Sequence, residues 1–203
     1  MTDPKAFYTE QLPAQWNRAL RDQVRAAAAA QRVLAGMQAA AGTIRIVVTG
    51  DGGGTFHLNL SGGELAPGDS PSHEPFLTLV QERSHFERLA AEAGDSALGF
   101  LGGLSGLAGD MKFTKERIDA LAAAPGTVRF CLSGEGGFDL VAHFGPGEPA
   151  PEPATTITVE TDAYQELKSG ALNPQDAFLG GQIQVDGDMQ AAMQLALTMM
   201  APD

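Results

Sequence analysis

The sequence predicts an α+β fold with a mostly antiparallel sheet covered by helices, and it predicts this unit twice in one chain. In each half, pairs of alternating β-rich segments come first and helical segments follow them. The motif Phe-Leu-Gly-Gly with a later Gly-Asp-Met occurs at 100–111 and again at 178–189. A repeat of this length can be a small domain or half of one. We therefore expect one unit over residues 1–110 and a second over 111–203, sharing a helix at 111–124.

The first unit is predicted to open with a long helix over residues 13–41. This segment is rich in Ala, Gln and Arg, and Gly42 follows it as a stop. Its larger apolar residues fall at helical intervals and predict one buried stripe. These residues are Trp16, Leu20, Val24, Val33, Leu34 and Met37.

Two β-rich segments come next, at 43–49 and 55–60, and a glycine-rich run at 50–54 separates them. This pattern is typical of a β-hairpin. A dinucleotide-binding turn would need a helix after the glycines, whereas residues 56–60 alternate as a strand. The rest of the unit is predicted as a loop at 61–75, a strand at 76–81, a helix at 84–93 and a glycine-rich connection at 96–109.

The second unit repeats this order of elements. Thr161 or Asp162 is expected to cap the start of the short helix at 162–169, and Gly170 is expected to end it. The sequence predicts a hairpin of 127–133 with 138–144, an acidic proline-rich loop at 145–153, a strand at 155–159, a helix at 162–169, a strand at 181–185 and a helix at 188–200.

The charge of the chain argues against nucleic acid as a partner. Thirteen Lys and Arg residues stand against 25 Asp and Glu residues, giving a net charge of −12, and no basic cluster is present. No apolar run approaches the ~20 residues that span a bilayer, and the start of the sequence does not have the pattern of a secretory signal. We expect a soluble, cytoplasmic protein without stable membrane insertion.

The sequence predicts no catalytic residue, metal site or cofactor, and the chain is not expected to be an enzyme. No nucleophile and base can be paired from motif spacing, and the four histidines fall in different predicted elements. Cys131 is expected to be a buried, unreactive thiol. Residues 186–188 (Asp-Gly-Asp) are interpreted as a turn that caps the last helix, since a calcium loop needs more oxygen ligands.

The last helix has an apolar stripe made mostly of methionine. Met189, Met193, Leu197 and Met200 recur at intervals of four, four and three, which places them on one face. Methionine adapts to apolar partners of varied shape. The stripe is therefore either ordinary core or the lining of an apolar site.

The second unit also resembles a known family. The quoted segments are Thr-Ile-Thr-Val at 156–159, Leu-Lys-Ser-Gly at 167–170, Leu-Asn-Pro-Gln-Asp-Ala-Phe at 172–178 and Gly-Gln-Ile-Gln-Val-Asp-Gly-Asp-Met at 181–189. Their order resembles the C-terminal half of the sterol carrier protein type 2 family of lipid-binding domains. Extended back, the resemblance covers roughly residues 111–203, and the first unit resembles a diverged copy that lacks the Asn-Pro-Gln segment.

This resemblance implies a five-stranded sheet covered by helices and an apolar tunnel for sterols, fatty acids or acyl chains, without covalent chemistry. The residues that it assigns to lipid binding come from the motif, its strand and the final helix. They are Phe178, Leu179, Ile183, Val185, Met189, Met193 and Leu197. Gln182 and Gln184 stand where the family commonly has lysines.

We expect the chain to bind and carry a long apolar ligand without catalysis. Burial of a methylene contributes ~0.8 kcal/mol, so a 16-carbon chain gains roughly 12 kcal/mol before the costs of immobilisation. Two alternatives stay open. One is a ligand-free interaction or assembly module with a filled core and a protein partner, and the other is an accessory subunit of a lipid-metabolising enzyme.

Overall fold

The computed structural model describes residues 4–93, 112–123 and 126–200. The strands are β1 (Ala41–Thr49), β2 (Gly54–Ser61), β3 (Glu64–Gly68), β4 (Pro75–Glu82), β5 (Gly126–Ser133), β6 (Asp139–Phe144), β7 (Thr155–Glu160) and β8 (Ile183–Gly187). The helices are α1 (Pro4–Ala6), the π-helical turn η1 (Phe7–Gln11), α2 (Leu12–Gln38), α3 (Arg83–Ala93), α5 (Lys115–Ala123), α6 (Thr161–Ser169), α7 (Pro174–Leu179) and α8 (Met189–Met200).

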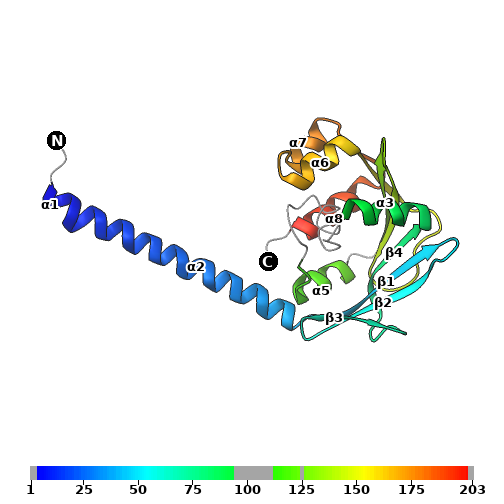
Figure 1. Cartoon of the computed structure of the whole chain (residues 1–203), viewed down its shortest axis with the longest axis horizontal. Coiled ribbons are helices and arrows are strands. Elements are labelled where there is room, and N and C mark those ends of the chain that lie inside the picture. The colour runs from blue at the N-terminus through cyan, green and yellow to red at the C-terminus, as the bar shows by residue number, and fades with distance from the viewer. Residues whose placement is uncertain (1–3, 94–111, 124–125, 201–203) are drawn as a thin grey trace.

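The described strands form one mixed sheet in the order β3-β2-β1-β4-β6-β5-β7-β8. The helices α3, α5, α6, α7 and α8 lie on one side of this sheet, and α2 projects away from it (Figure 1). The predicted α+β class is confirmed. The predicted five-stranded, mostly antiparallel sheet needs correction, because the sheet is larger and the pairs β1–β4 and β5–β7 run parallel.

Both predicted hairpins are present. β1 pairs antiparallel with β2 and β5 pairs antiparallel with β6, each across a glycine-containing turn. Residues 64–68, predicted as part of a loop, instead form the edge strand β3 against β2. Pro67 lacks an N–H and cannot donate a hydrogen bond to a neighbouring strand, so its presence favoured the prediction of a loop. Proline is tolerated in an edge strand such as β3. The prediction was therefore wrong at this strand for a local reason.

The two halves of the sheet meet where β4 pairs antiparallel with β6. The register runs from Leu77 opposite Phe144 to Val80 opposite Val141. Helix α3 strengthens this junction, since the amide of Asp139 donates to Nδ1 of His85 at 3.2 Å and Arg88 donates to the carbonyl of Gly137 at 2.7 Å. The predicted boundary at 110/111 lies outside the described residues, so the division into two units stays a prediction.

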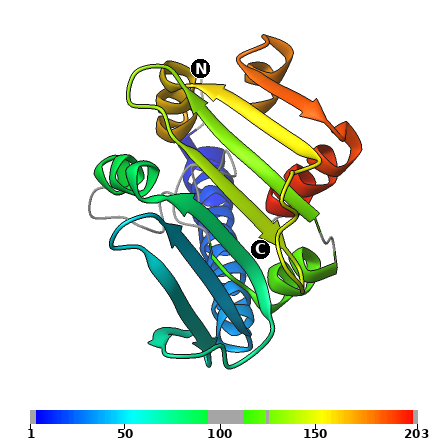
Figure 2. The same cartoon turned by 90° about the vertical axis from the view of Figure 1, so that its right-hand side faces the viewer.

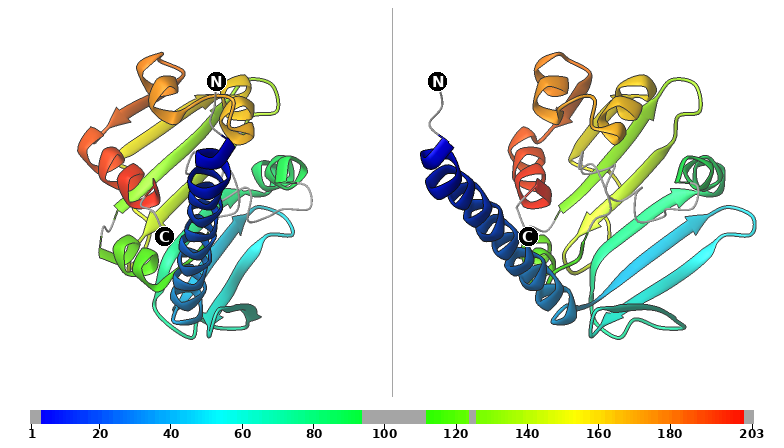
Figure 3. Two further views of the ribbon diagram at one scale, coloured as in Figure 1. Left: turned by 90° about the vertical axis from the view of Figure 1, so that its left-hand side faces the viewer. Right: turned by 60° about the vertical axis from the view of Figure 1, so that its left-hand side comes forward.

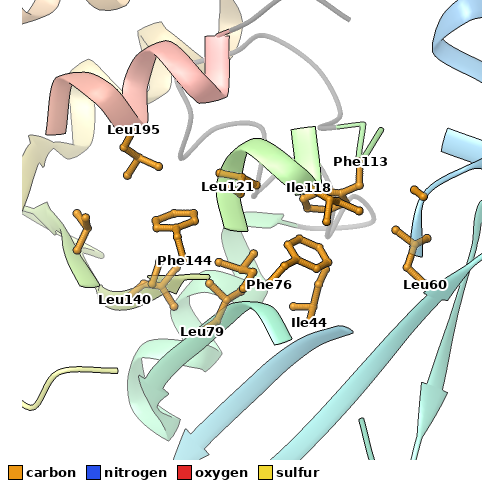
Figure 4. Close-up of a cluster of buried hydrophobic side chains, with 14 of the residues drawn as sticks. Ile44, Leu60, Phe76, Leu79, Phe113, Ile118, Leu121, Leu140, Phe144 and Leu195 are labelled. Atoms are coloured by element: carbon orange, nitrogen blue, oxygen red, sulfur yellow. The ribbon is translucent and has the colours of Figure 1, made fainter. Parts of the chain in front are cut away.

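The hydrophobic core lies between the sheet and its helices. Phe76 and Phe113 contact edge to face with ring centroids 5.5 Å apart. Leu121 from α5 and Leu195 from α8 point toward Phe144 and the strands below it (Figure 4). The most buried large side chains, each at most 2% exposed, include Ile44, Leu121 and Leu140. This single apolar layer fixes the helices on one side of the sheet.

The face of the sheet opposite the helices is turned toward the viewer in Figure 2. Many of its side chains are polar, with Arg45 donating to Thr78 and Arg129 to Asp139, and we call it the polar face. The loop 145–154 crosses part of this face and buries Thr127 and His143. The hydroxyl of Thr127 lies 2.9 Å from Nδ1 of His143 and accepts a hydrogen bond from the amide of Ala150 at 3.0 Å. Hydrogen bonds therefore attach this loop to the sheet.

We expect acid to loosen the loop 145–154 locally. Both carboxylate oxygens of Glu148 accept hydrogen bonds from Arg45 at 2.7 Å, and this contact lowers the pKa of Glu148 below its ordinary value of 4.5. Because the pKa is lowered by folding, the stabilisation is complete above about pH 4.5 and is lost as the pH falls through the folded-state pKa. Glu148→Gln should mimic acid and speed hydrogen exchange at the amide of Ala150 several-fold near neutral pH. Glu152→Gln in the same loop is the control, and equal exchange in both variants would contradict the assignment.

The predicted long helix is present, but its apolar stripe is not buried. Trp16 is 73% exposed, Val24 60% and Leu20 56%, and Leu34 is 54% exposed. Val33 and Met37 are half-buried. Within α2 only Gly36 is buried, where a Cβ would lie 3.0 Å from Cβ of Thr114. The prediction of a buried stripe was wrong, because among the described residues α2 contacts the body through its C-terminal end.

Cys131 is half-buried on the polar face rather than fully buried. Burial and a hydrogen bond to Asp139 raise the pKa of its thiol. Burial alone would raise the pKa of Asp139 as well, but hydrogen bonds from Arg129 and Cys131 outweigh it, and the pKa of Asp139 is lowered. A thiol with a raised pKa forms little thiolate at neutral pH, which agrees with the expected lack of reactivity.

Candidate functional site

The Asn-Pro-Gln segment forms the start of helix α7. The side chain of Asn173 accepts a hydrogen bond from the amide of Gln175 at 2.8 Å and caps the helix, and Pro174 occupies its first turn. After α7, the amide of Gln182 donates to the carbonyl of Ala177 at 2.8 Å, which leads the chain directly into β8. Ala177 is fully buried and holds α7 against the body.

The Gly-Asp-Met segment forms the turn from β8 into α8, as predicted. Gly187 has a φ of +94°, and a Cβ on it would lie 2.0 Å from the carbonyl oxygen of Ala154. Oδ1 of Asp188 accepts from the amide of Ala191 at 3.0 Å and caps α8. The turn therefore fixes the direction in which α8 leaves the sheet.

Strands β5, β7 and β8 present two apolar rows to the helices. Phe130, Ile157 and Val185 lie opposite one another in one row, and Leu132, Val159 and Ile183 form the next. Five of these six are only partly buried: Phe130, Ile157 and Val159 on the inner strands and Ile183 and Val185 on the edge strand. Tyr164 of α6 and Leu195 of α8 belong to the same core cluster. We call the surface formed by these two rows the apolar floor, and helices lie around it.

The predicted lipid-binding residues fall into three groups along this floor. Ile183 and Val185 are half-buried in β8 and belong to the apolar rows. Phe178 and Leu179 end α7 before β8, exposed by 41% and 74%, and Met189 and Met193 begin α8 after β8, exposed by 40% and 59%. Figure 3 shows α7 and α8 near the two ends of β8, on the same side of the sheet. The side chain of Leu197 lies outside the described residues.

Met189 and Met193, the two residues of the methionine stripe whose side chains the structure describes, are not part of the core. Among the described side chains of α8, Ala192 and Leu195 are buried, at 5% and 7% exposure. Met189 and Met193 lie about 60° to 160° around the helix from them, given 100° per residue. The interpretation of these two methionines as ordinary core was therefore wrong.

Several acidic residues lie in the elements next to the floor. Asp176 in α7 and Asp186 and Asp188 around β8 all lie at the surface. Within the described residues, no group of three His, Cys, Asp or Glu side chains is placed to hold a metal ion. No described helix combines the length and hydropathy needed to cross a membrane. The described floor can thus contribute apolar contact to a ligand, with polar groups confined to its margin.

Sequence reasoning missed the inner part of this floor. Phe130, Ile157 and Val159 were predicted only as strand residues, and Tyr164 was not singled out. Their signal was the period-2 alternation of residues 156–159, which places Ile157 and Val159 on one face. Antiparallel pairing with β8 then brings them beside Val185 and Ile183.

The C-terminal part of the chain is similar in sequence to known proteins. Residues 114–199 match the family model described as SCP-2 sterol transfer family. Hydroxysteroid dehydrogenase-like protein 2 of Bos taurus is 32% identical over 84 residues, which cover 38% of this chain and 20% of the relative, and the protein of the same name from Homo sapiens gives the same values. The chain therefore spans about a fifth of the length of these relatives.

Solved structures give distant similarity. Sterol Carrier Protein 2 from Yarrowia lipolytica in its apo form is 22% identical, with 39% of this chain and 76% of that chain covered and a TM-score of 0.31. Palmitated SCP2L2 from Aedes aegypti is 17% identical, with 43% and 94% covered and a TM-score of 0.32. By the sequence match, the C-terminal segment 114–199, less than half of the chain, is similar to the SCP-2 sterol transfer family.

Proposed function

We propose that the C-terminal part of the chain binds and carries a long apolar ligand, such as a fatty acid, an acyl lipid or a sterol-like molecule. The observation that carries this proposal is the partly buried apolar floor of β5, β7 and β8, which lies within the segment that matches the SCP-2 sterol transfer family. An apolar surface that a protein leaves partly open commonly marks an interaction or ligand site. No catalytic step is part of the proposal.

The ligand would lie along the helix side of β8. Phe178 and Leu179 would contact one end of it, Met189 and Met193 the other, and Ile183 and Val185 would form the floor between them. Leu197 would extend the methionine stripe along α8. Five strand residues span about 17 Å, which suits an extended acyl chain better than a compact solute. A tunnel around this path is part of the proposal.

Native mass spectrometry of the purified chain, followed by organic extraction, tests the proposal directly. We expect a stoichiometric lipid-like mass, or a mass shift after addition of a fluorescent fatty acid. Apolar burial alone makes micromolar affinity reachable, with weak selectivity among chains of similar length. An apo mass that does not shift with fatty acid would contradict the proposal and favour the ligand-free interaction module.

Met193→Glu should weaken uptake of a fluorescent fatty acid by tenfold or more, because a carboxylate would be placed against the apolar chain. Met193 is 59% exposed, so the substitution should leave the fold intact. Ala191→Glu is the control, since it adds the same group at an exposed position of α8 about 160° around the helix from Met193. The measurement is fluorescence titration, with circular dichroism to check folding. Equal loss in both variants would remove Met193 from the proposed site.

A role as accessory to a lipid-metabolising enzyme is the second candidate. The observation that favours it is that the similar segment makes up only a fifth of larger relatives named hydroxysteroid dehydrogenase-like protein 2. In such a role the chain would present its ligand to a catalytic partner. Co-purification of a dehydrogenase-like partner that is lost together with ligand binding would support this candidate.

The proposed duplication would make the first half a diverged copy of the second. In its support, β1 pairs antiparallel with β2 and parallel with β4, and β5 pairs in the same way with β6 and β7. Helices α3 and α6 each follow directly after the parallel strand. The edge of β7 pairs with β8, whereas the corresponding edge of β4 pairs with β6. The first copy would therefore contribute structure rather than a second site of this kind, and the repeated motif at 100–111 lies outside the described residues.

A further inference from the structure

Helix α2 has an unusual separation of charge from apolar surface. Written as heptads with Leu20 at position a, its a and d positions are Pro13, Trp16, Leu20, Gln23, Ala27, Ala30, Leu34 and Met37. None of its five charged side chains falls on a, d or the flanking e and g positions. Arg18, Arg25 and Arg32 are spaced by seven at position f, and Arg21 and Asp22 occupy b and c. We call the uncharged a/d row the seam.

This seam is open along most of the helix. Trp16, Leu20 and Leu34 are 73%, 56% and 54% exposed, and the flanking Leu12 and Val24 are 47% and 60% exposed. Figure 1 shows α2 extending away from the body for nearly its whole length. An isolated helix of this kind leaves its apolar face in water, which favours pairing with a second helix.

The seam is complementary to itself in an antiparallel arrangement. Full overlap of two α2 helices about residue 25, the middle residue of α2, places Trp16 opposite Leu34 and Leu20 opposite Ala30. Gln23 then meets Ala27, and Pro13 meets Met37. Each a position faces a d position, and near the middle of the seam Leu20 and Gln23 face the small side chains of Ala30 and Ala27. A parallel arrangement would instead place Trp16 opposite Trp16, where the two rings would clash. It would also place Ala27 opposite Ala27, where a void would remain.

Charge favours the same arrangement. The arginines at position f point away from the seam, so pairing does not bring them together. Residues 39–203 carry eight basic and 22 acidic residues, a net of −14. Antiparallel pairing keeps these two acidic bodies at opposite ends of the helix pair. It also brings the positive end of each helix dipole toward the partner's body, near Glu116.

We propose that α2 joins two copies of this chain through an antiparallel helix pair along the seam. Twenty-seven residues extend about 40 Å, and a strip about 12 Å wide on each helix gives roughly 1,000 Å² in total. This area lies at the small end of specific interfaces. The dimer therefore forms reversibly with concentration.

Sedimentation of the full chain over a concentration series tests the pairing. We expect a monomer–dimer equilibrium, and Leu20→Glu with Leu34→Glu should shift the dissociation constant at least tenfold while circular dichroism stays unchanged. Arg25→Glu is the control, because it introduces the same side chain on the far side of the same helix. Wild-type protein that stays monomeric, seam variants that still dimerise, or equal loss in Arg25→Glu would each overturn the proposal.

Trp16 is the single tryptophan of the chain and reports the seam directly. Its emission should move to shorter wavelength as the wild type dimerises and should not move in the Leu20→Glu, Leu34→Glu variant. The same emission is measured after addition of vesicles of anionic phospholipid, to compare dimerisation with membrane binding. A shift that needs vesicles and occurs without self-association would assign the seam to a membrane surface and overturn the proposal.

Disulfide cross-linking of single-cysteine variants in a Cys131→Ser background tests the antiparallel orientation of the two helices. A mixture of Trp16→Cys and Leu34→Cys chains should cross-link on oxidation, since residue 16 faces residue 34 of the partner. Either variant alone should cross-link far less. Efficient cross-linking of each variant with itself would contradict the antiparallel arrangement.

Discussion

Phe144→Ala should destabilise the whole sheet by about 3 to 5 kcal/mol, the usual cost of removing a buried aromatic side chain. Phe144 is 4% exposed and lies in the core beneath α5 and α8. Its backbone pairs with Leu77 of β4 and Gly126 of β5, so it lies at the junction of the two halves. The lost contacts therefore belong to both halves. For a chain of this size the melting temperature should fall by about 10 °C.

Urea unfolding followed by far-ultraviolet circular dichroism measures this effect. Trp16 lies outside the core, so tryptophan emission would not report unfolding of the sheet. Val141→Ala on the polar face of the same strand is the control and should cost about 1 kcal/mol. A single transition that shifts as a whole is expected. Two separate transitions with only one affected would instead favour two independently folding units divided near 110/111.

Gly187→Ala should cost about 3 kcal/mol or more and should also abolish the proposed lipid uptake. Gly187 has a φ of +94°, which disfavours any residue with a Cβ. A Cβ at this position would also lie 2.0 Å from the carbonyl oxygen of Ala154. That carbonyl accepts a hydrogen bond from the amide of Asp188 at 3.1 Å. Any shift that relieves the clash therefore disturbs the cap of α8 and the end of β8 together.

Gly181→Ala separates the strain of a positive φ from the steric clash of an added Cβ. Gly181 has a similar φ of +77°, but a Cβ there would meet no atom within 4 Å. The conformational penalty alone should cost about 1 to 2 kcal/mol. Thermal unfolding and fatty-acid titration of both variants provide the measurement. If the two substitutions have the same effect, close packing at Gly187 is not what positions α8.

Much of the fold could be predicted because its signals are local. The alternation of residues 43–49 and 55–60 around glycines predicts the first hairpin, and Gly170 ends α6 with a φ of +74° as a C-terminal glycine should. The pairing of β4 with β6 had no such signal. It joins residues about 60 positions apart, and nothing in either strand specifies the partner.

Burial was the harder part to predict for the candidate site. Periodicity identified Met189 and Met193 as one face of α8 and Trp16 and Leu20 as one face of α2, and both faces are exposed. A periodic stripe reports which side chains share a face, but what covers that face depends on the rest of the fold. Ile183 and Val185 were assigned to lipid binding by the family resemblance alone, and strand alternation with the pairing to β7 places both on one side of the sheet.

The two ends of the sheet limit how the protein can aggregate. An open sheet exposes unpaired backbone groups on its outer strands, and another chain could extend it there. β3 and β8 are both only five residues long. Pro67 removes one donor from β3, and the carboxylates of Glu64 and Asp186 would come close to an incoming strand. Growth of the sheet into fibres is therefore disfavoured at both edges.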